Sequence, residues 1–209
     1  MKGLILCGGK SSRMGTDKGL LKQDKLTWTE IAAQKLSNLD LPILVSISQQ
    51  QLPAYSSLFK PDQLILDRNE LAIGGPLLGL LSAHLLFPQQ DLFVLACDMR
   101  DISLSLLKNL HNEYSEGNCE ALVYSTENIC QPMCGIYSST GLARINDLFA
   151  NQQLQKHSMM YVLERLKTIA IPVKEDDLAC FINYNTPEEL TGTSISTKSP
   201  LDPSHKGQP

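Results

Sequence analysis

The chain has 209 residues, of which 43% are apolar and 19% charged, and a formal net charge of −4 at pH 7. This length suits one domain with a full hydrophobic core. The slightly acidic charge balance argues against a nucleic-acid-binding protein, since such proteins typically carry an excess of basic residues. No stretch approaches the ~20 apolar residues of a membrane span and the N-terminal apolar run is too short for a signal peptide, so we expect a cytoplasmic protein without membrane or nucleic-acid partners.

Short apolar runs alternate with segments of helical periodicity along most of the chain. In chain order the predicted elements are a strand at 3–7, a helix at 28–36, strands at 43–48 and 64–66, a helix at 76–86, a strand at 92–96, a helix at 103–111, strands at 121–125 and 133–137, helices at 140–149 and 159–166, and strands at 169–173 and 181–184. This alternation predicts a three-layer α/β fold with a mostly parallel central sheet.

The last residues differ in composition from the rest of the chain. After residue 190 the sequence turns to Thr, Ser, Gly, Pro and Lys without apolar periodicity. We therefore predict one domain at residues 1–190 and a flexible tail at 191–209. The six cysteines lack zinc-site spacing and are expected to be reduced thiols, and His84 is expected on a helix surface.

A polar, glycine-rich segment directly follows the first predicted strand. Gly8 and Gly9 let the backbone approach a ligand closely, and the exposed N–H groups of such a turn bind anions. Ser11 and Ser12 add hydroxyl donors, and three cationic side chains, including those of Arg13 and Lys18, fall within nine residues. This combination indicates a polyphosphate-binding loop, with a solvated surface turn as the alternative. The segment has neither the P-loop spacing nor that of the dinucleotide-binding fingerprint.

Two aspartates follow other predicted strands. Asp98 comes after the strand at 92–96, at the sheet edge where the glycine-rich segment is also expected. A single carboxylate there can hold Mg²⁺ while water and phosphate oxygens complete the coordination, although a strand-end turn residue is the alternative. Asp67 ends the strand at 64–66, and on chemistry alone it is as suited to capping a turn as to contacting a ligand.

Residues 4–18, which read L-I-L-C-G-G-K-S-S-R-M-G-T-D-K, resemble the signature of the molybdenum cofactor guanylyltransferase (MobA-like) family of nucleotidyltransferases. The segment around Asp98 resembles the metal-binding motif of that family, with Arg100 in place of the usual proline. The G-P-L-x-G motif after Asp67 and the N-x-N-T-P-E-E-L string from residue 183 are also similar to family motifs. The resemblance implies a Rossmann-like nucleotidyltransferase fold for residues 1–190.

The same resemblance implies roles for individual residues. Lys18, Arg13 and Asp98 would be catalytic, with Asp98 as the Mg²⁺ ligand. The nucleotide-binding residues implied are Leu6, Cys7, Gly8, Gly9, Ser11, Ser12, Arg13, Lys18, Ser46, Asp67 and Asp98, where Ser46 stands at the place of an asparagine and Cys7 at the place of an alanine. The residues implied near the acceptor are Pro132, Asn183 and Asn185.

The resemblance implies transfer of GMP from GTP to the phosphate of molybdopterin in the molybdenum cofactor, with release of pyrophosphate and formation of a guanine dinucleotide. Molybdoenzymes or their chaperones would then be further partners. Two alternatives stay open at this point. One is an enzyme on the same scaffold that uses CTP or a sugar-phosphate acceptor, and the other is a non-catalytic nucleotide-binding module.

Overall fold

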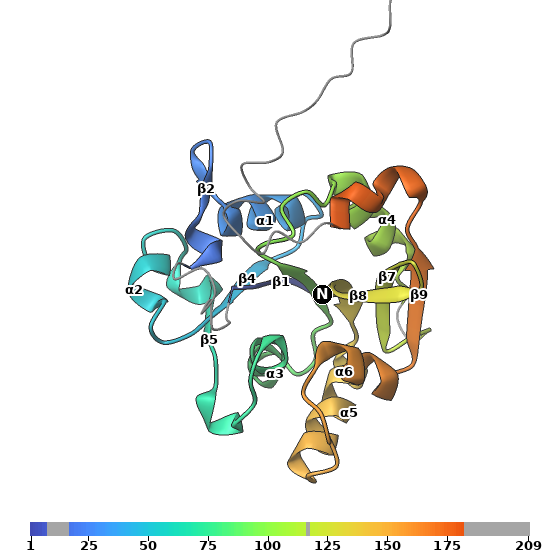
Figure 1. Cartoon of the computed structure of the whole chain (residues 1–209). Helices are drawn as coiled ribbons and strands as arrows, with labels where there is room; N and C mark the ends of the chain where they lie inside the picture. The colour runs from blue at the N-terminus through green and yellow to red at the C-terminus, as the bar shows by residue number, and fades with distance from the viewer. Residues whose placement is uncertain (8–16, 116–117, 182–209) are drawn as a thin grey trace, which may run out of the picture.

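A computed structural model describes residues 1–7, 17–115 and 118–181 (Figure 1). The predicted tail at 191–209 and the predicted strand at 181–184, apart from its first residue, lie outside the described residues. The domain boundary at residue 190 therefore stays a prediction.

The centre of the fold is a seven-stranded sheet. Its strands, from one edge to the other, are β5 (Leu64–Leu66), β4 (Ile43–Ile47), β1 (Lys2–Leu6), β6 (Leu92–Ala96), β8 (Ile129–Tyr137), β7 (Ala121–Thr126) and β9 (Thr168–Pro172). Neighbouring strands are parallel except where β8 pairs antiparallel with β6 and with β7. The mostly parallel sheet predicted from the alternation of elements is confirmed.

Helices cover both faces of the sheet, as Figure 1 shows. The helices are α1 (Trp28–Ser37), α2 (Leu52–Tyr55), α3 (Pro76–Leu86), α4 (Leu104–Glu113), α5 (Ser139–Ala150) and α6 (Met159–Arg165). The shorter elements are the hairpin of β2 (Lys22–Gln23) and β3 (Leu26–Thr27) and the 3₁₀ helices η1 (Lys18–Leu20), η2 (Pro61–Gln63), η3 (Asn69–Leu71) and η4 (Glu175–Phe181). α1 and α4 lie on one face and α3, α5 and α6 on the other, which confirms the three-layer fold.

The two faces of the central strands contribute to two separate hydrophobic clusters. Ile5 packs under α1 and α4, whereas its neighbours Leu4 and Leu6 pack against the layer of α3. Alternate side chains of a strand point to opposite faces, and a parallel strand covered on both faces is apolar along its whole length. This burial explains why the strands appear in the sequence as short continuous apolar runs.

His84 lies in the core, so the expected surface position is wrong. Its exposed fraction is 3%, because the leucine-rich α3 is buried on nearly every side. Burial lowers the pKa of the imidazole, opposed by the nearby carboxylate of Asp147. The six cysteines are free thiols, as predicted. Within the described ranges, no helix combines the length and apolar character needed to cross a bilayer.

The turn after β6 packs against the start of α1. Trp28, the first residue of α1, is 2% exposed, and the Arg100 guanidinium carbon lies 5.8 Å from the centre of its ring. Thr27 caps this helix together with Glu30, and each side chain accepts a hydrogen bond from the backbone N–H of the other residue. The position of α1 is thereby fixed next to the end of β6.

Candidate functional site

The carboxyl ends of the central parallel strands meet at one edge of the sheet. Backbone hydrogen bonds continue just beyond the strands, from the Cys7 N–H to the Ser46 carbonyl at 3.1 Å and from the Cys97 N–H to the Leu6 carbonyl at 3.2 Å. The Asp67 N–H donates to the Ile47 carbonyl at 2.9 Å. Ligands of open α/β sheets bind beyond such strand ends, so this edge is the candidate site.

Lys18 and Asp98 form an ion pair at this edge. Lys18 Nζ lies 3.2 Å from Asp98 Oδ2, although the two residues are 80 positions apart in the sequence. Their side chains are 20% and 25% exposed, so both groups are accessible to a ligand while partly shielded from water. A cation and a carboxylate in this environment suit a ligand that carries phosphates and a metal ion.

Ser46 and Asp67 form a second polar contact on the same edge. The buried Ser46 hydroxyl donates to Asp67 Oδ1 at 2.7 Å. α3 passes close by, since a Cβ at Gly79 would overlap the Ser46 side chain and contact Leu6. Burial raises the pKa of the Asp67 carboxyl, and the Ser46 hydrogen bond opposes the rise. Glycine at position 79 therefore leaves room for the hydroxyl that orients Asp67.

We expect the Asp67→Asn variant to be more stable than the wild type at neutral pH, by on the order of 0.5–1 kcal/mol in the free energy of unfolding. Burial disfavours the charged carboxylate, and asparagine keeps an oxygen for the Ser46 hydroxyl without the charge. Urea denaturation at pH 7.5 measures the difference. The exposed Asp62, changed to asparagine, is the control and should leave stability unchanged.

The pH dependence of this difference has a definite sign. A carboxyl with a raised pKa in the folded state favours folding below its unfolded pKa, near 3.8, and loses that contribution as pH rises through the folded value. The advantage of Asp67→Asn should therefore shrink as pH falls from 7.5 toward 4. A wild type more stable than the variant at pH 7.5 would contradict the explanation.

Three residues that the sequence analysis did not single out also reach this edge. Gln51 and Tyr55 both donate hydrogen bonds to the carboxylate of Asp17, at 2.7 and 3.2 Å. The buried Thr29 hydroxyl donates to the Gly19 carbonyl at 2.9 Å and lies 3.3 Å from the Cys7 thiol. The sequence signal for Gln51 and Tyr55 was their spacing of four, which places two side chains on one helix face.

Leu6 ends β1 and Cys7 directly follows the strand, and the two residues are 5% and 7% exposed. The Cys7 thiol packs in the cluster under α1, and the Leu6 side chain packs against α3. Their place in the fold agrees with a role in shaping the bottom of the site. The other sequence-predicted members of the first loop, Gly8, Gly9, Ser11, Ser12 and Arg13, lie outside the described residues.

Pro132 lies on the antiparallel side of the same edge. The last pair between β6 and β8 joins Leu95 to Cys134, so β8 carries Pro132 two residues further, toward the level at which Asp98 follows β6. An irregularity in the pairing of β7 with β8 falls here, and the Pro132 carbonyl accepts a hydrogen bond from the Tyr137 hydroxyl at 2.8 Å. Bulges of this kind are frequent beside active sites. Asn183 and Asn185 lie outside the described residues.

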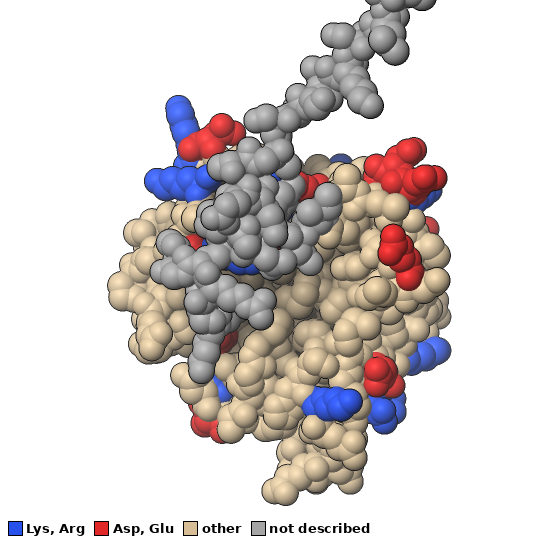
Figure 2. Space-filling view, in the orientation of Figure 1, with Lys and Arg blue, Asp and Glu red and all other residues tan. Residues whose placement is uncertain are grey.

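The carboxylate of Asp98 at the carboxyl edge of the sheet suits a hard divalent cation, provided that a substrate supplies further oxygen ligands. The described residues contain no group of three or more His, Cys, Asp and Glu side chains able to hold a metal. Mg²⁺ is commonly bound by one or two carboxylates together with substrate phosphates and water, which matches the accessible carboxylate of Asp98. On the face in Figure 2, charged side chains of both signs lie scattered among the described residues, without one extended basic field.

Comparisons with known proteins point to one group. A model of the MobA-like NTP transferase domain matches residues 3–169. A molybdenum cofactor guanylyltransferase from Campylobacter jejuni is 31% identical over 187 residues, which cover 89% of this chain and 91% of that relative. A probable molybdenum cofactor guanylyltransferase from Flavobacterium johnsoniae is 28% identical over 192 residues, covering 92% of this chain and 95% of the relative.

Solved structures agree on the fold. The crystal structure of molybdopterin-guanine dinucleotide biosynthesis protein A from Archaeoglobus fulgidus matches with a TM-score of 0.72 and 23% identity, and the match covers 91% of this chain and 95% of that one. A cytidylyltransferase from Leptospira borgpetersenii matches with a TM-score of 0.64 and 15% identity, over 90% of this chain and 82% of the other. At these identities the likeness concerns the fold, which is shared by nucleotidyltransferases of different specificity.

Proposed function

The chain belongs to the MobA-like NTP transferase family, and from this premise we propose that it transfers GMP from GTP to the terminal phosphate of molybdopterin in the molybdenum cofactor. The products are pyrophosphate and the guanine dinucleotide form of the cofactor. The observation that carries the proposal is the Lys18–Asp98 pair at the carboxyl edge of the sheet. It combines a phosphate-binding cation with a carboxylate suited to a metal ion.

In the proposed reaction, an oxygen of the acceptor phosphate attacks the α-phosphorus of GTP. The bond between the α-phosphorus and the oxygen that bridges it to the β-phosphorus breaks, and pyrophosphate leaves with that oxygen. The acceptor is already an anion at neutral pH, so the reaction needs no strong general base. Lys18 and Arg13 contribute positive charge that balances the charge developing on the phosphates, and the remaining catalysis is positioning.

We further propose that Asp98 holds Mg²⁺ together with the triphosphate. When bound, this ion supplies charge neutralisation at the phosphate oxygens. Asp67, oriented by Ser46, contacts the nucleotide at the other side of β1, and Pro132 borders the acceptor with Asn183 and Asn185. Molybdoenzymes or their chaperones receive the product in this proposal.

One assay separates the proposed reaction from its rivals. The purified protein is incubated with molybdopterin-bound cofactor, Mg²⁺ and each labelled nucleoside triphosphate, and both nucleotide incorporation and pyrophosphate release are measured. Incorporation of guanylate with stoichiometric pyrophosphate supports the proposal. Incorporation of cytidylate, transfer to a sugar phosphate instead, or GTP binding without turnover would each reject it.

A further inference from the structure

The side-chain amide of Gln51 connects two segments that are far apart in the sequence. Its Nε2 donates to the Cys7 carbonyl at 3.0 Å and to Asp17 Oδ2 at 2.7 Å. Its Oε1 accepts from the N–H and the hydroxyl of Ser48, at 2.8 and 3.0 Å. Both donors of the amide are thereby used, and the Ser48 N–H fixes which end is the oxygen. The Gln51 side chain therefore connects the residue after β1 to Asp17.

Tyr55 reaches the same carboxylate from one helical turn further on. Its hydroxyl donates to Asp17 Oδ1 at 3.2 Å and lies 3.5 Å from the Thr29 hydroxyl. The Tyr55 side chain is fully buried, and burial raises the pKa of the phenol far above its usual value. The phenol therefore stays protonated and remains a hydrogen-bond donor to Asp17 at physiological pH.

These contacts fix the backbone on both sides of Lys18. Asp17 Oδ1 also accepts from the Gly19 N–H at 2.9 Å and caps η1, whose first residue is Lys18. The Gly19 carbonyl accepts from Thr29, and a Cβ at Gly19 would overlap the hydroxyls of Tyr55 and Thr29. The 3₁₀ turn packs so closely on Tyr55 and Thr29 that only glycine fits at position 19.

We propose that Gln51 and Tyr55 are positioning residues for Lys18. They hold the Asp17 carboxylate at both oxygens, and this sets the direction in which the Lys18 side chain leaves the backbone toward Asp98. The inference rests on the proposed function, in which the Lys18 ammonium binds the phosphates of the nucleotide. A displacement of about 1 Å in such a group costs a reaction up to about a hundredfold in rate.

A double-mutant cycle on the full-length protein tests the positioning role. Gln51→Leu alone should lower kcat for GMP transfer by about ten- to a hundredfold, with the KM for the acceptor changed less than about twofold. In a Lys18→Met background, the same change should cost less than about threefold, because both residues act through one ammonium group. Gln50→Leu, an exposed glutamine beside it, is the matched control and should leave kcat unchanged.

Additive losses in the cycle would overturn the proposal, since they would mean that Gln51 acts independently of Lys18. If Gln51→Leu does not fold, as judged by circular dichroism, Tyr55→Phe replaces it, with an expected loss of about three- to tenfold for one hydrogen bond. Equal effects of Tyr55→Phe with and without Lys18 would contradict the positioning role in the same way.

The same double-mutant cycle can be measured without the reaction, by using calorimetry to compare the affinity of the wild type and the variants for tripolyphosphate. If the effects of the two substitutions on tripolyphosphate binding are coupled but the protein transfers no GMP, the positioning role is supported and the proposed function is rejected. GMP transfer with additive losses at both residues would reject the positioning role and keep the function. Failure of both measurements would reject both proposals.

Discussion

Replacement of Lys18 by methionine is expected to lower kcat for GMP transfer by about two to three orders of magnitude. Methionine keeps most of the length of the side chain but carries no charge to balance the negative charge that develops on the phosphates. The half-buried position of the ammonium beside Asp98 makes this charge more effective than one in bulk water. Steady-state rates at saturating GTP and acceptor measure the effect.

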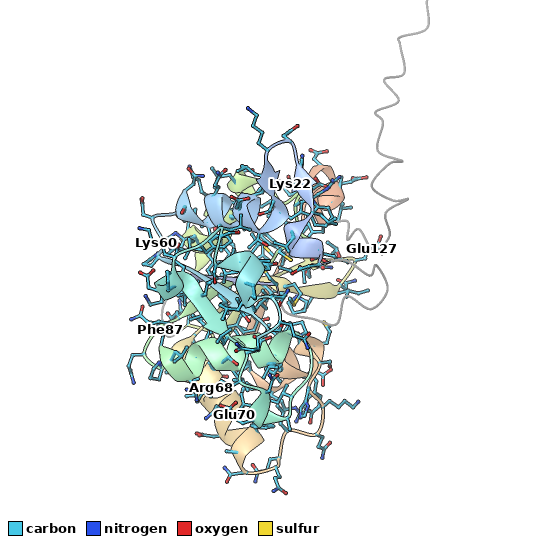
Figure 3. The ribbon with its side chains drawn as sticks, turned by 90° about the vertical axis from the view of Figure 1, so that its left-hand side faces the viewer. Lys22, Lys60, Arg68, Glu70, Phe87 and Glu127 are labelled. Carbon is cyan, nitrogen blue, oxygen red and sulfur yellow. The ribbon has the colours of Figure 1, made fainter. Side chains whose placement is uncertain are left out.

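The control for this variant is Lys22→Met. Lys22 is exposed on the β2–β3 hairpin, in the layer of α1 and away from α3, as Figure 3 shows. The variant should retain kcat within about twofold of the wild type because the charge is exposed to water and is therefore screened. Loss of the Lys18–Asp98 ion pair should change the free energy of unfolding by less than about 1 kcal/mol. A folded Lys18→Met protein with nearly normal kcat would reject the mechanism.

The Asp98→Asn variant is expected to lose at least about two orders of magnitude in kcat. Raising Mg²⁺ to about ten times the concentration that saturates the wild type should not restore the rate. Asparagine preserves the shape of the side chain and removes the negative charge that favours a hard cation. Chelation of divalent ions with EDTA should abolish activity of the wild type, and added Mg²⁺ should restore it. Rates across a Mg²⁺ titration give both results.

Asp101→Asn is the matched control, since it removes a nearby carboxylate that pairs with Arg100 at 3.5 Å instead of with Lys18. This variant should keep its Mg²⁺ dependence. Two results would count against the role of Asp98: near-normal kcat for Asp98→Asn at saturating Mg²⁺, or full wild-type activity in EDTA. Either would show that the reaction does not depend on a metal held at this carboxylate.

The sequence predicted the edge of the sheet that brings Lys18 and Asp98 together. Both follow buried strands, and the carboxyl ends of parallel strands meet at one edge whatever their order in the sheet. The apolar runs do not reveal that order, because a strand buried on both faces has no periodicity to distinguish its neighbours. The contact at 3.2 Å between residues 80 positions apart therefore required the structure.

The antiparallel direction of β8 was not predicted, although a signal was present. Only Glu127 and Asn128 separate β7 from β8, and both have positive φ, at 48° and 65°. So short a connection leaves no room for a helical crossover and requires a hairpin. Gln51 was not identified because its spacing from Tyr55 predicts a shared helix face but does not reveal which distant groups the side chain will meet. Its partners Cys7 and Asp17 lie at least 34 positions away in the chain.

Trp28 gives the molecule an internal optical reporter. It is the only tryptophan in the chain, so the indole fluorescence of the protein comes from this one residue. The ring is buried under the Arg100 guanidinium, two residues beyond Asp98, and belongs to the helix that also carries Thr29. Its emission will shift to longer wavelength when the core is exposed to water. Unfolding can thus be followed in unlabelled protein, and the ring at the same time reports on its contact with the Arg100 guanidinium.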